Sequence, residues 1–322
     1  MIEAESLSKR YGPNLAIEAV SFKADRGDVL GFLGPNGAGK TTTMRILTGF
    51  MPASEGRAKV AGYDVFEHPR EVKRRIGYLP ERPPLYRDMI VRDYLSYVAE
   101  LKGLSGSKRE TAIEKVISGC GLDEVDNRLA GHLSKGYQQR LGIAQAMVND
   151  PEVLILDEPT IGLDPKQIVE MREMIKSLAG NRTVILSSHI LAEVSQICNR
   201  VVIINRGKIV ANDYIDTLRK PLKSMERVRL RVQKDDPSIA ETIKALPGVK
   251  GISRKGDAWL IEADPNSGTA EKAAKAAIDK GWGLEEAAHV EMSLEDVFLR
   301  LIEEADARNP MSSVDKYAEG GE

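Results

Sequence analysis

Long apolar runs, cysteine and an excess of either charge are all scarce in this sequence of 322 residues. No stretch approaches the roughly 18 consecutive apolar residues of a membrane-spanning helix, so we expect no transmembrane segment. The first residues lack a basic region followed by an apolar one, so we expect no signal peptide. The two cysteines, Cys120 and Cys198, are too few for a disulfide framework or a metal-ligand cluster, which predicts reduced thiols in a cytosolic protein.

The overall charge gives no hint of a polyanionic partner. The formal net charge is −2 at neutral pH, which provides no general attraction for nucleic acid or anionic lipid. The basic run at residues 73–75 lacks interleaved aromatic residues, and we interpret it as a solvated face. We therefore expect no nucleic acid among the partners. A hydrophobic content of 42% is enough for a globular protein with a sizeable core.

The chain is long enough for one large domain and one smaller domain. A shift in composition separates them, and we place the large domain at 1–220, a linker at 221–227 and the small domain at 228–307. Residues 308–322 are predicted to form a disordered tail. Strand and helix patterns alternate in the small domain as βαββαβ, which predicts a small α+β, ferredoxin-like unit.

The large domain combines the patterns of two kinds of sheet. Two alternating segments within residues 1–25 predict an antiparallel edge. Short apolar runs at 153–156 and 183–186 predict parallel strands that are buried on both faces, and residues 201–210 predict a hairpin. Apolar residues at helical spacing predict a helical insertion at about 82–146. Together these patterns predict an α/β fold with a mixed sheet.

A glycine-rich loop is the most informative motif of the sequence. It follows an apolar stretch and precedes a helical pattern, and its residues are Gly34, Pro35, Asn36, Gly37, Ala38, Gly39, Lys40, Thr41 and Thr42. Glycines let the backbone wrap tightly and direct its N–H groups inward, and the helix adds the positive end of its dipole. Lys40 can reach the β- and γ-phosphates, and the Thr41 hydroxyl can ligate Mg²⁺. The motif predicts a nucleoside triphosphate site.

Two adjacent acids, Asp157 and Glu158, follow the buried apolar run at 153–156. Carboxylates at the end of a buried strand are costly unless they serve a purpose. Asp157 is placed to hold Mg²⁺ through water, and Glu158 is placed to orient and deprotonate an attacking water molecule. The pair therefore predicts a triphosphate hydrolase.

The segment Leu133-Ser134-Lys135-Gly136-Tyr137 resembles the Leu-Ser-Gly-Gly-Gln signature of ATP-binding cassette (ABC) ATPases. Its middle departs from the usual sequence, but Ser134 and Gly136 keep their places. Ser134 stands where a helix N-cap is expected, and a helix start with a hydroxyl and a glycine can bind a γ-phosphate. In the family, this element serves the ATP that is held by the opposite subunit.

Further positions match the family pattern. The segment 161–164 resembles the loop that passes between subunits, and His189 resembles the switch histidine that contacts the γ-phosphate. Tyr11 matches the aromatic residue that stacks on adenine. Glu81 occupies the position of a glutamine that usually joins the Mg²⁺ shell, and its carboxylate can still accept a hydrogen bond from metal-bound water.

The resemblance covers about residues 1–220 and implies a P-loop NTPase cassette, with a mixed sheet core, an antiparallel β edge and a helical insertion. The segments Tyr-Leu-Pro-Glu, at residues 78–81, and Ser-Leu-Glu-Asp-Val-Phe, at residues 293–298, resemble one branch of the family. That branch contains the ATPase subunits of multidrug, sodium and gliding-motility exporters, and the small C-terminal domain fits it.

The resemblance implies an ATP-binding and ATP-hydrolysing transport subunit. One chain has one phosphate loop and one signature, which implies a head-to-tail homodimer that closes on two ATP–Mg²⁺. The chain would lie at the cytoplasmic face of the membrane and dock through its helical insertion on separate transmembrane permease subunits, most simply for export. Two alternatives remain: a soluble cassette ATPase that acts on DNA or ribosomes, and a degenerate, regulatory nucleotide binder. ATPases that act on DNA usually have a long coiled coil, and those that act on ribosomes usually have two cassettes in one chain; this sequence has neither. A degenerate nucleotide binder is disfavoured because the sequence keeps Lys40, Asp157, Glu158 and His189.

Overall fold

The computed structural model describes residues 1–180, 182–218, 226–290 and 294–308. Contacts between Cα atoms divide the chain into two compact units, the first holding Met1–Ile215 with the segment from Leu301 onward, and the second Asp216–Arg300. Each unit has its own hydrophobic core. Most of the predicted linker, up to residue 225, lies outside the described residues, as does the predicted tail beyond residue 308.

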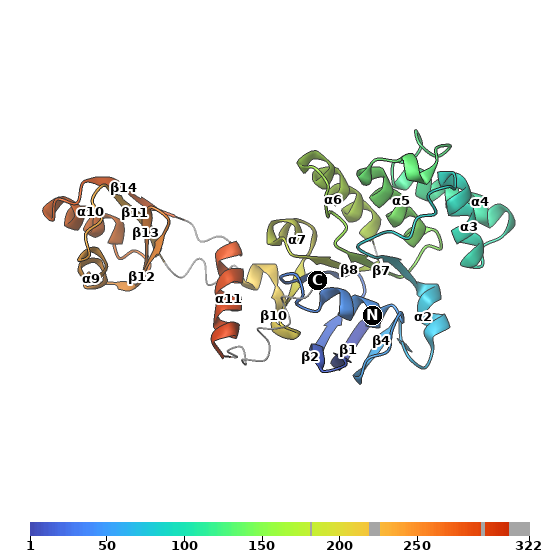
Figure 1. Ribbon diagram of the computed structural model, residues 1–322, viewed down its shortest axis with the longest axis horizontal. Coiled ribbons are helices and arrows are strands. Elements are labelled where there is room, and N and C mark those ends of the chain that lie inside the picture. The colour runs from blue at the N-terminus through green and yellow to red at the C-terminus, as the bar shows by residue number, and fades with distance from the viewer. Residues whose placement is uncertain (181, 219–225, 291–293, 309–322) are drawn as a thin grey trace. The chain divides into compact units, whose positions relative to one another are not determined.

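A mixed six-stranded sheet forms the centre of the first unit (Figure 1). Its strand order is β10-β9-β3-β8-β7-β6, and all neighbours are parallel except β10 and β9. The bounds are β3 Val29–Leu33, β6 Ile76–Leu79, β7 Val153–Asp157, β8 Thr183–Ser188, β9 Arg200–Asn205 and β10 Lys208–Tyr214. Every residue of β7 and β8 is buried, because helices cover both faces of the parallel part. The predicted buried strands and the hairpin are confirmed.

An antiparallel sheet completes the first unit, in the order β2-β1-β4-β5. Its strands are β1 Ile2–Tyr11, β2 Asn14–Ala24, β4 Glu55–Val60 and β5 Tyr63–Asp64. One hydrophobic cluster contains side chains from both sheets, and the rings of Phe22 and Phe32 lie 5.3 Å apart within it. The predicted antiparallel edge is confirmed, and the shared core joins it to the central sheet.

The helices of the first unit are α1 Lys40–Leu47, α2 Pro69–Arg75, α3 Val91–Leu101, α4 Gly106–Gly119, α5 Lys135–Met147, α6 Pro165–Ala179 and α7 Leu191–Ile197, with a 3₁₀ turn at Ala130–His132. The predicted helical insertion is present as α3, α4 and α5, which pack against one another, and α5 also packs against β6 (Figure 1). Helix α2 was not predicted. It begins at a proline, and an ion pair between Glu71 and Arg75, four residues apart at 2.6 Å, supports this helix of seven residues.

The second unit has the predicted βαββαβ order. Its elements are β11 Glu226–Val232, α9 Ile239–Lys244, β12 Val249–Lys255, β13 Ala258–Ala263, α10 Thr269–Asp279 and β14 Leu284–His289. The strand order is β12-β13-β11-β14 and every pair is antiparallel, which is the split-βαβ arrangement. Trp282, 1% exposed, packs with Val228 and Ile261 in its core.

The observed end of the second unit differs from the predicted one, because it falls within helix α11, Leu294–Arg308. The predicted small domain extends to residue 307, whereas contacts group the residues from Leu301 onward with the first unit. The physical reason lies at Asp306. Its Oδ1 accepts a hydrogen bond from Asn205 Nδ2 at 2.8 Å and forms an ion pair with Arg206 Nε at 3.2 Å. None of the helices in the described part of the chain combines the length and the apolar composition of a membrane-spanning segment.

Both cysteines are expected to be inert to thiol reagents in the folded protein. Cys120 is 0% exposed and Cys198 is 8% exposed. Burial disfavours the thiolate, and it raises the pKa of Cys120 to about 12 and that of Cys198 well above its ordinary value. Titration with Ellman's reagent at pH 8 should therefore detect no thiol before denaturation and both thiols after it. Rapid reaction of either cysteine in the folded protein would contradict this packing.

Candidate nucleotide-binding site

The glycine-rich loop connects the end of β3 to the start of α1 by a backbone path that requires glycine. Gly39 adopts φ 104°, in the left-handed region, immediately before the first residue of α1. At Gly34, a Cβ atom would lie 2.2 Å from the carbonyl oxygen of Ile204 on the neighbouring strand β9. The N–H of Gly207 donates to the Ala38 carbonyl at 3.0 Å and supports the loop from behind. The backbone therefore wraps tightly around the N-terminus of α1.

A pocket of 270 Å³ opens in front of this loop. Its lining residues are Ala16, Asn36, Gly37, Ala38, Gly39, Lys40, Thr41, Thr42, Glu81, Glu158 and Ile161. The fold thus brings most of the predicted phosphate loop together with Glu81 and Glu158, which are far away in the sequence. N–H groups at a helix N-terminus, beside a lysine, form a site for a phosphate chain.

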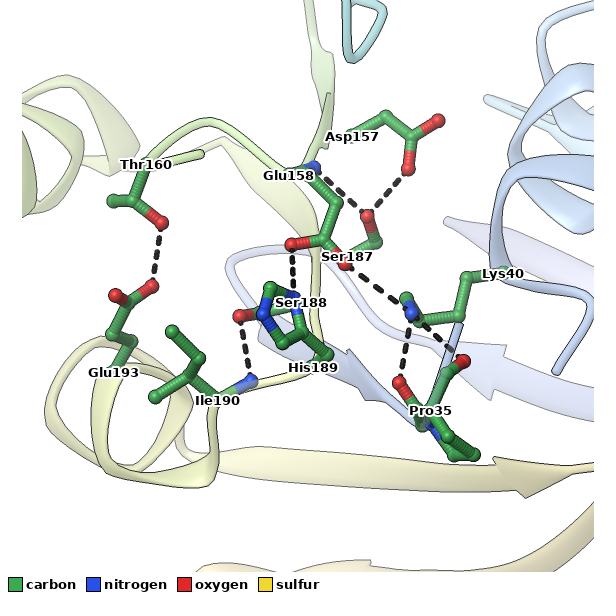
Figure 2. Close-up of polar contacts among 11 residues, drawn as sticks. Pro35, Lys40, Asp157, Glu158, Thr160, Ser187, Ser188, His189, Ile190 and Glu193 are labelled. Atoms are coloured by element: carbon green, nitrogen blue, oxygen red, sulfur yellow. Dashed lines mark hydrogen bonds and ion pairs between the residues drawn. The ribbon is translucent and has the colours of Figure 1, made fainter. Parts of the chain in front are cut away.

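Lys40 is buried, at 6% exposure, and three oxygen atoms surround its ammonium group (Figure 2). Nζ donates to the carbonyl oxygens of Gly34 at 2.7 Å and Pro35 at 3.1 Å, and lies 3.2 Å from Glu158 Oε1. Gly34 and Pro35 therefore contact Lys40 rather than the pocket. A buried ammonium is stable only with such partners, and these three contacts hold Lys40 at the wall of the pocket.

Asp157 ends strand β7 and is completely buried. Ser187 Oγ donates to its Oδ1 at 2.5 Å, while Oδ2 has no hydrogen-bond partner among the described residues. Burial raises the pKa of Asp157, although hydrogen bonds from Ser187 and Thr41 lower it in part. A carboxylate with a free oxygen beside a threonine hydroxyl fits the hard, oxygen-binding character of Mg²⁺. Within the described residues, no cluster of three or more acidic, histidine or cysteine side chains forms a metal site by itself.

Glu158 lies between Lys40 and His189 (Figure 2). Its Oε2 is 3.0 Å from His189 Nδ1, and its side chain is 7% exposed. The backbone of Glu158 adopts φ 50°, which non-glycine residues rarely adopt. Its N–H donates to the Ser187 carbonyl at 3.2 Å and to Ser187 Oγ at 3.0 Å. A carboxylate fixed at the wall of a phosphate pocket beside an imidazole can orient and deprotonate water.

Ser187 is a site residue that the sequence interpretation missed. It is paired across the sheet with Asp157, because β7 and β8 are adjacent parallel strands. The Ser187-Ser188-His189 sequence after a buried run was the available signal. The order of strands in the sheet, which makes Ser187 a neighbour of Asp157, cannot be read from that run.

Tyr11 is not among the residues that line the pocket. It ends β1 at the turn before β2 and is 45% exposed. Its hydroxyl donates to Met51 Sδ at 3.0 Å, and Lys9 Nζ lies 5.7 Å from the centre of its ring. The predicted stacking of Tyr11 on adenine therefore stays a prediction.

Ser134 and Gly136 lie at the N-terminus of α5, outside the pocket lining. Ser134 is the N-cap, and its Oγ accepts from the Tyr137 N–H at 3.4 Å, as the sequence predicted. A Cβ atom on Gly136 would lie 3.0 Å from the side chain of Gln167 on α6. The pocket thus contains the phosphate loop but not the signature segment of the same chain.

The central sheet, the phosphate loop and the acid pair define a nucleotide-binding cassette, and comparison with known proteins identifies its family. Residues 17–161 match the ABC transporter family model. The bacitracin transport ATP-binding protein BcrA of Bacillus licheniformis is 36% identical, over 94% of this chain and 97% of that protein. The daunorubicin resistance ATP-binding protein DrrA2 of Streptomyces coeruleorubidus is 34% identical, over 93% and 94%.

Solved structures agree with these relatives. An ATP-binding subunit of an ABC transporter superposes with a TM-score of 0.63 at 31% identity, over 69% of this chain and 92% of that one. A dimeric bacterial ABC transporter cassette, 21% identical, has the same fold at a TM-score of 0.61, over 67% of this chain and 99% of that one. The chain belongs to the family of ABC transporter ATP-binding proteins. It is an ATP-binding, ATP-hydrolysing subunit, and the relatives support the transport interpretation rather than one on DNA or ribosomes.

Proposed function

We propose that two copies of the chain close head to tail on two ATP molecules and thereby drive export through separate transmembrane subunits at the cytoplasmic face of the membrane. The observation that carries this proposal is the absence of Ser134 and Gly136 from the pocket lining of their own chain. A second copy related by a two-fold axis can place its signature segment over the γ-phosphate. Closure is then favoured because ATP contacts both chains only in the closed state.

Each residue of the pocket has a proposed role in hydrolysis. Lys40 exchanges its contacts with the loop carbonyls for the β- and γ-phosphate oxygens of ATP. Glu158 orients the attacking water and accepts its proton, and His189 contacts the γ-phosphate. Separation of Lys40 from Glu158 frees the carboxylate for that role, so nucleotide binding prepares the base.

Thr41, Asp157 and Glu81 are proposed to hold Mg²⁺. The unpartnered Asp157 Oδ2 supports this assignment, as does the place of Thr41 and Glu81 on the pocket wall. Mg²⁺ is usually held by one or two carboxylates together with substrate phosphates and water, so a small set of protein oxygens is sufficient. The ion would neutralise the negative charge that develops on the phosphates.

A groove beside the helical insertion is proposed as the docking site for a transmembrane subunit. It has a volume of 770 Å³, and its residues include Arg70, Lys73, Arg74, Pro84, Tyr86, Tyr94, Tyr97, Leu101 and Lys102. Tyr86, Tyr97 and Leu101 are 54%, 39% and 69% exposed, although they are aromatic or apolar. An exposed apolar floor with a basic rim fits a cytoplasmic helix that carries apolar and acidic residues. Lys73 and Arg74 of the basic run are then part of this rim rather than only of a solvated face.

The transport interpretation is supported by what the relatives are named for. One is a bacitracin transport protein and another a daunorubicin resistance protein, and both match along nearly the full chain. Resistance to a toxic compound is most directly achieved by removing it, so we propose export as the direction. The small α+β unit is proposed as an accessory domain of this exporter subunit.

Charge introduced into the groove should release the chain from membranes without affecting nucleotide binding. We expect Leu101→Glu to abolish co-sedimentation with membranes from cells that contain the partner subunits, because a carboxylate would replace an apolar contact beside the groove floor. ATP affinity should stay unchanged, since Leu101 does not line the nucleotide pocket. Ile278→Glu is the matched control, because Ile278 is 65% exposed on a helix of the second unit. Equal membrane association of the two variants would contradict the docking site.

A further inference from the structure

A buried hydrogen bond lies beside Glu158 and His189 without reaching the pocket (Figure 2). Thr160 Oγ1 donates to Glu193 Oε2 at 2.5 Å, and the two residues are 7% and 6% exposed. Thr160 follows Glu158 by two residues, on the loop after β7. Glu193 follows His189 by four residues, in the first turn of α7. Neither residue lines the pocket, and neither was assigned a role by the resemblance to the family.

Burial makes the hydrogen bond between Thr160 and Glu193 costly to break. A carboxylate removed from water is unstable unless hydrogen bonds replace its hydration. The Thr160 hydroxyl supplies such a bond to Glu193 at 2.5 Å, and both side chains are buried. The N-terminal end of a helix also favours an acidic side chain in its first turn. The Thr160–Glu193 bond therefore fixes the loop after β7 to the first turn of α7.

This bond is the last of three contacts between side chains that join residues 157–160, at the end of β7 and in the loop after it, to residues 187–193, from the end of β8 to the first turn of α7. The first joins Asp157 to Ser187 at 2.5 Å, and the second joins the carboxylate of Glu158 to His189 at 3.0 Å. The Thr160–Glu193 bond is the third. Hydrogen bonds of Asp157 and Thr160 thus hold the chain on both sides of Glu158.

The backbone of Glu158 explains why such support matters. Its φ of 50° is unfavourable for a residue with a side chain, and such a conformation persists only where the surroundings hold it. On the N-terminal side, the Glu158 N–H is bonded to Ser187. On the C-terminal side, the Ile161 N–H donates to the Glu158 carbonyl at 3.2 Å, and Thr160 lies within this turn. Glu193 fixes Thr160, so it holds the C-terminal side of the same turn.

We propose that Glu193 is a positioning residue for ATP hydrolysis, which acts through Thr160 to hold the carboxylate of Glu158 at its distance from His189. The proposal rests on the proposed role of Glu158 as the base. Without the bond, the turn after Glu158 relaxes toward a more common backbone conformation, and the carboxylate moves away from the attacking water. Misplacement of a catalytic group by about 1 Å can cost about 10²-fold in rate.

Two substitutions at Thr160 separate the hydroxyl from the shape of the side chain. Thr160→Val keeps the shape and removes the donor, and we expect kcat to fall by about 10- to 100-fold with the affinity for ATP unchanged. Thr160→Ser keeps the donor and should retain most of the activity. Glu193→Gln should show a smaller loss than Thr160→Val, because an amide oxygen still accepts the bond. Glu173→Gln, an exposed change of the same kind on α6, serves as the control.

Repeating the Thr160→Val substitution in the Glu158→Gln variant distinguishes a positioning role from a general effect on folding. In Glu158→Gln the base is absent, so adding Thr160→Val should lower the residual single-turnover rate little. A role in folding alone would lower the rate by the same factor in both backgrounds, together with Tm, and that result would overturn the proposal. Full kcat in Thr160→Val would also overturn it. Normal turnover in Glu158→Gln alone would instead remove the proposed base, an outcome that is distinguishable from both.

Discussion

Replacing Glu158 by glutamine is expected to slow ATP turnover by about 10²- to 10⁴-fold while ATP binding is retained. The substitution changes almost nothing in shape, and an amide oxygen can still accept a contact from Lys40. An amide cannot accept a proton from water, however. Glu158 is held in the pocket wall between Lys40 and His189, and the glutamine would keep that place without the ability to act as a base.

The same variant should accumulate as an ATP-dependent dimer, because the proposed closed state would reopen only after hydrolysis. Size-exclusion chromatography with and without ATP measures this shift, and a steady-state ATPase assay measures turnover. Glu173→Gln is again the matched control, since that carboxylate is exposed on α6 and pairs with Lys176. Wild-type turnover in Glu158→Gln would remove Glu158 from catalysis.

Damage to either half of the proposed shared site should be nearly as severe. Lys40→Ala removes the ammonium group that would hold the β- and γ-phosphates, and Ser134→Arg places a bulky charge at the helix start that would meet the γ-phosphate. Loss of one such contact to a reacting group typically costs about 10²- to 10³-fold. In a homodimer, each variant damages both sites, so both homodimers should be almost inactive.

The two variants should differ in binding before closure. Lys40→Ala should lose ATP affinity as a monomer, because Lys40 lines the pocket of its own chain. Ser134→Arg should bind ATP as the unmodified monomer does, because Ser134 lies outside that pocket. Calorimetry on the monomers measures this difference. Ser105→Arg, the same change at the exposed N-cap of α4, should leave both binding and turnover unaffected.

Much of the fold follows from short-range patterns in the sequence. The buried strands β7 and β8, the hairpin of β9 and β10, and the βαββαβ unit were all predicted, because their periodicity and turn residues act locally. Helix α2 was not predicted, because a helix of seven residues shows little periodicity. The grouping of the residues after Leu301 with the first unit was not predicted either, since it depends on contacts of Asp306 with a distant hairpin.

The candidate site shows the same division. Lys40, Asp157 and Glu158 belong to motifs whose chemistry can be recognised in a few consecutive residues. Ser187 and the Thr160–Glu193 bond depend on which strands are neighbours in the sheet, and a buried glutamate in a short helix resembles any surface glutamate in the sequence. The roles of Ser134 and His189 came from a resemblance to a family. For Ser134, the proposed place beside ATP depends on a second chain, which a pattern within one sequence cannot show.

Mixing the two inactive variants tests most directly whether each ATP site is shared between chains. In a mixed dimer of Lys40→Ala with Ser134→Arg, one site combines both damaged halves. The other combines an intact phosphate loop with an intact signature segment. The account predicts that ATPase activity partly returns when subunits exchange, with mixed dimers confirmed by two affinity tags. Full activity in the Ser134→Arg homodimer, or no recovery in confirmed mixed dimers, would contradict a shared site that works by itself.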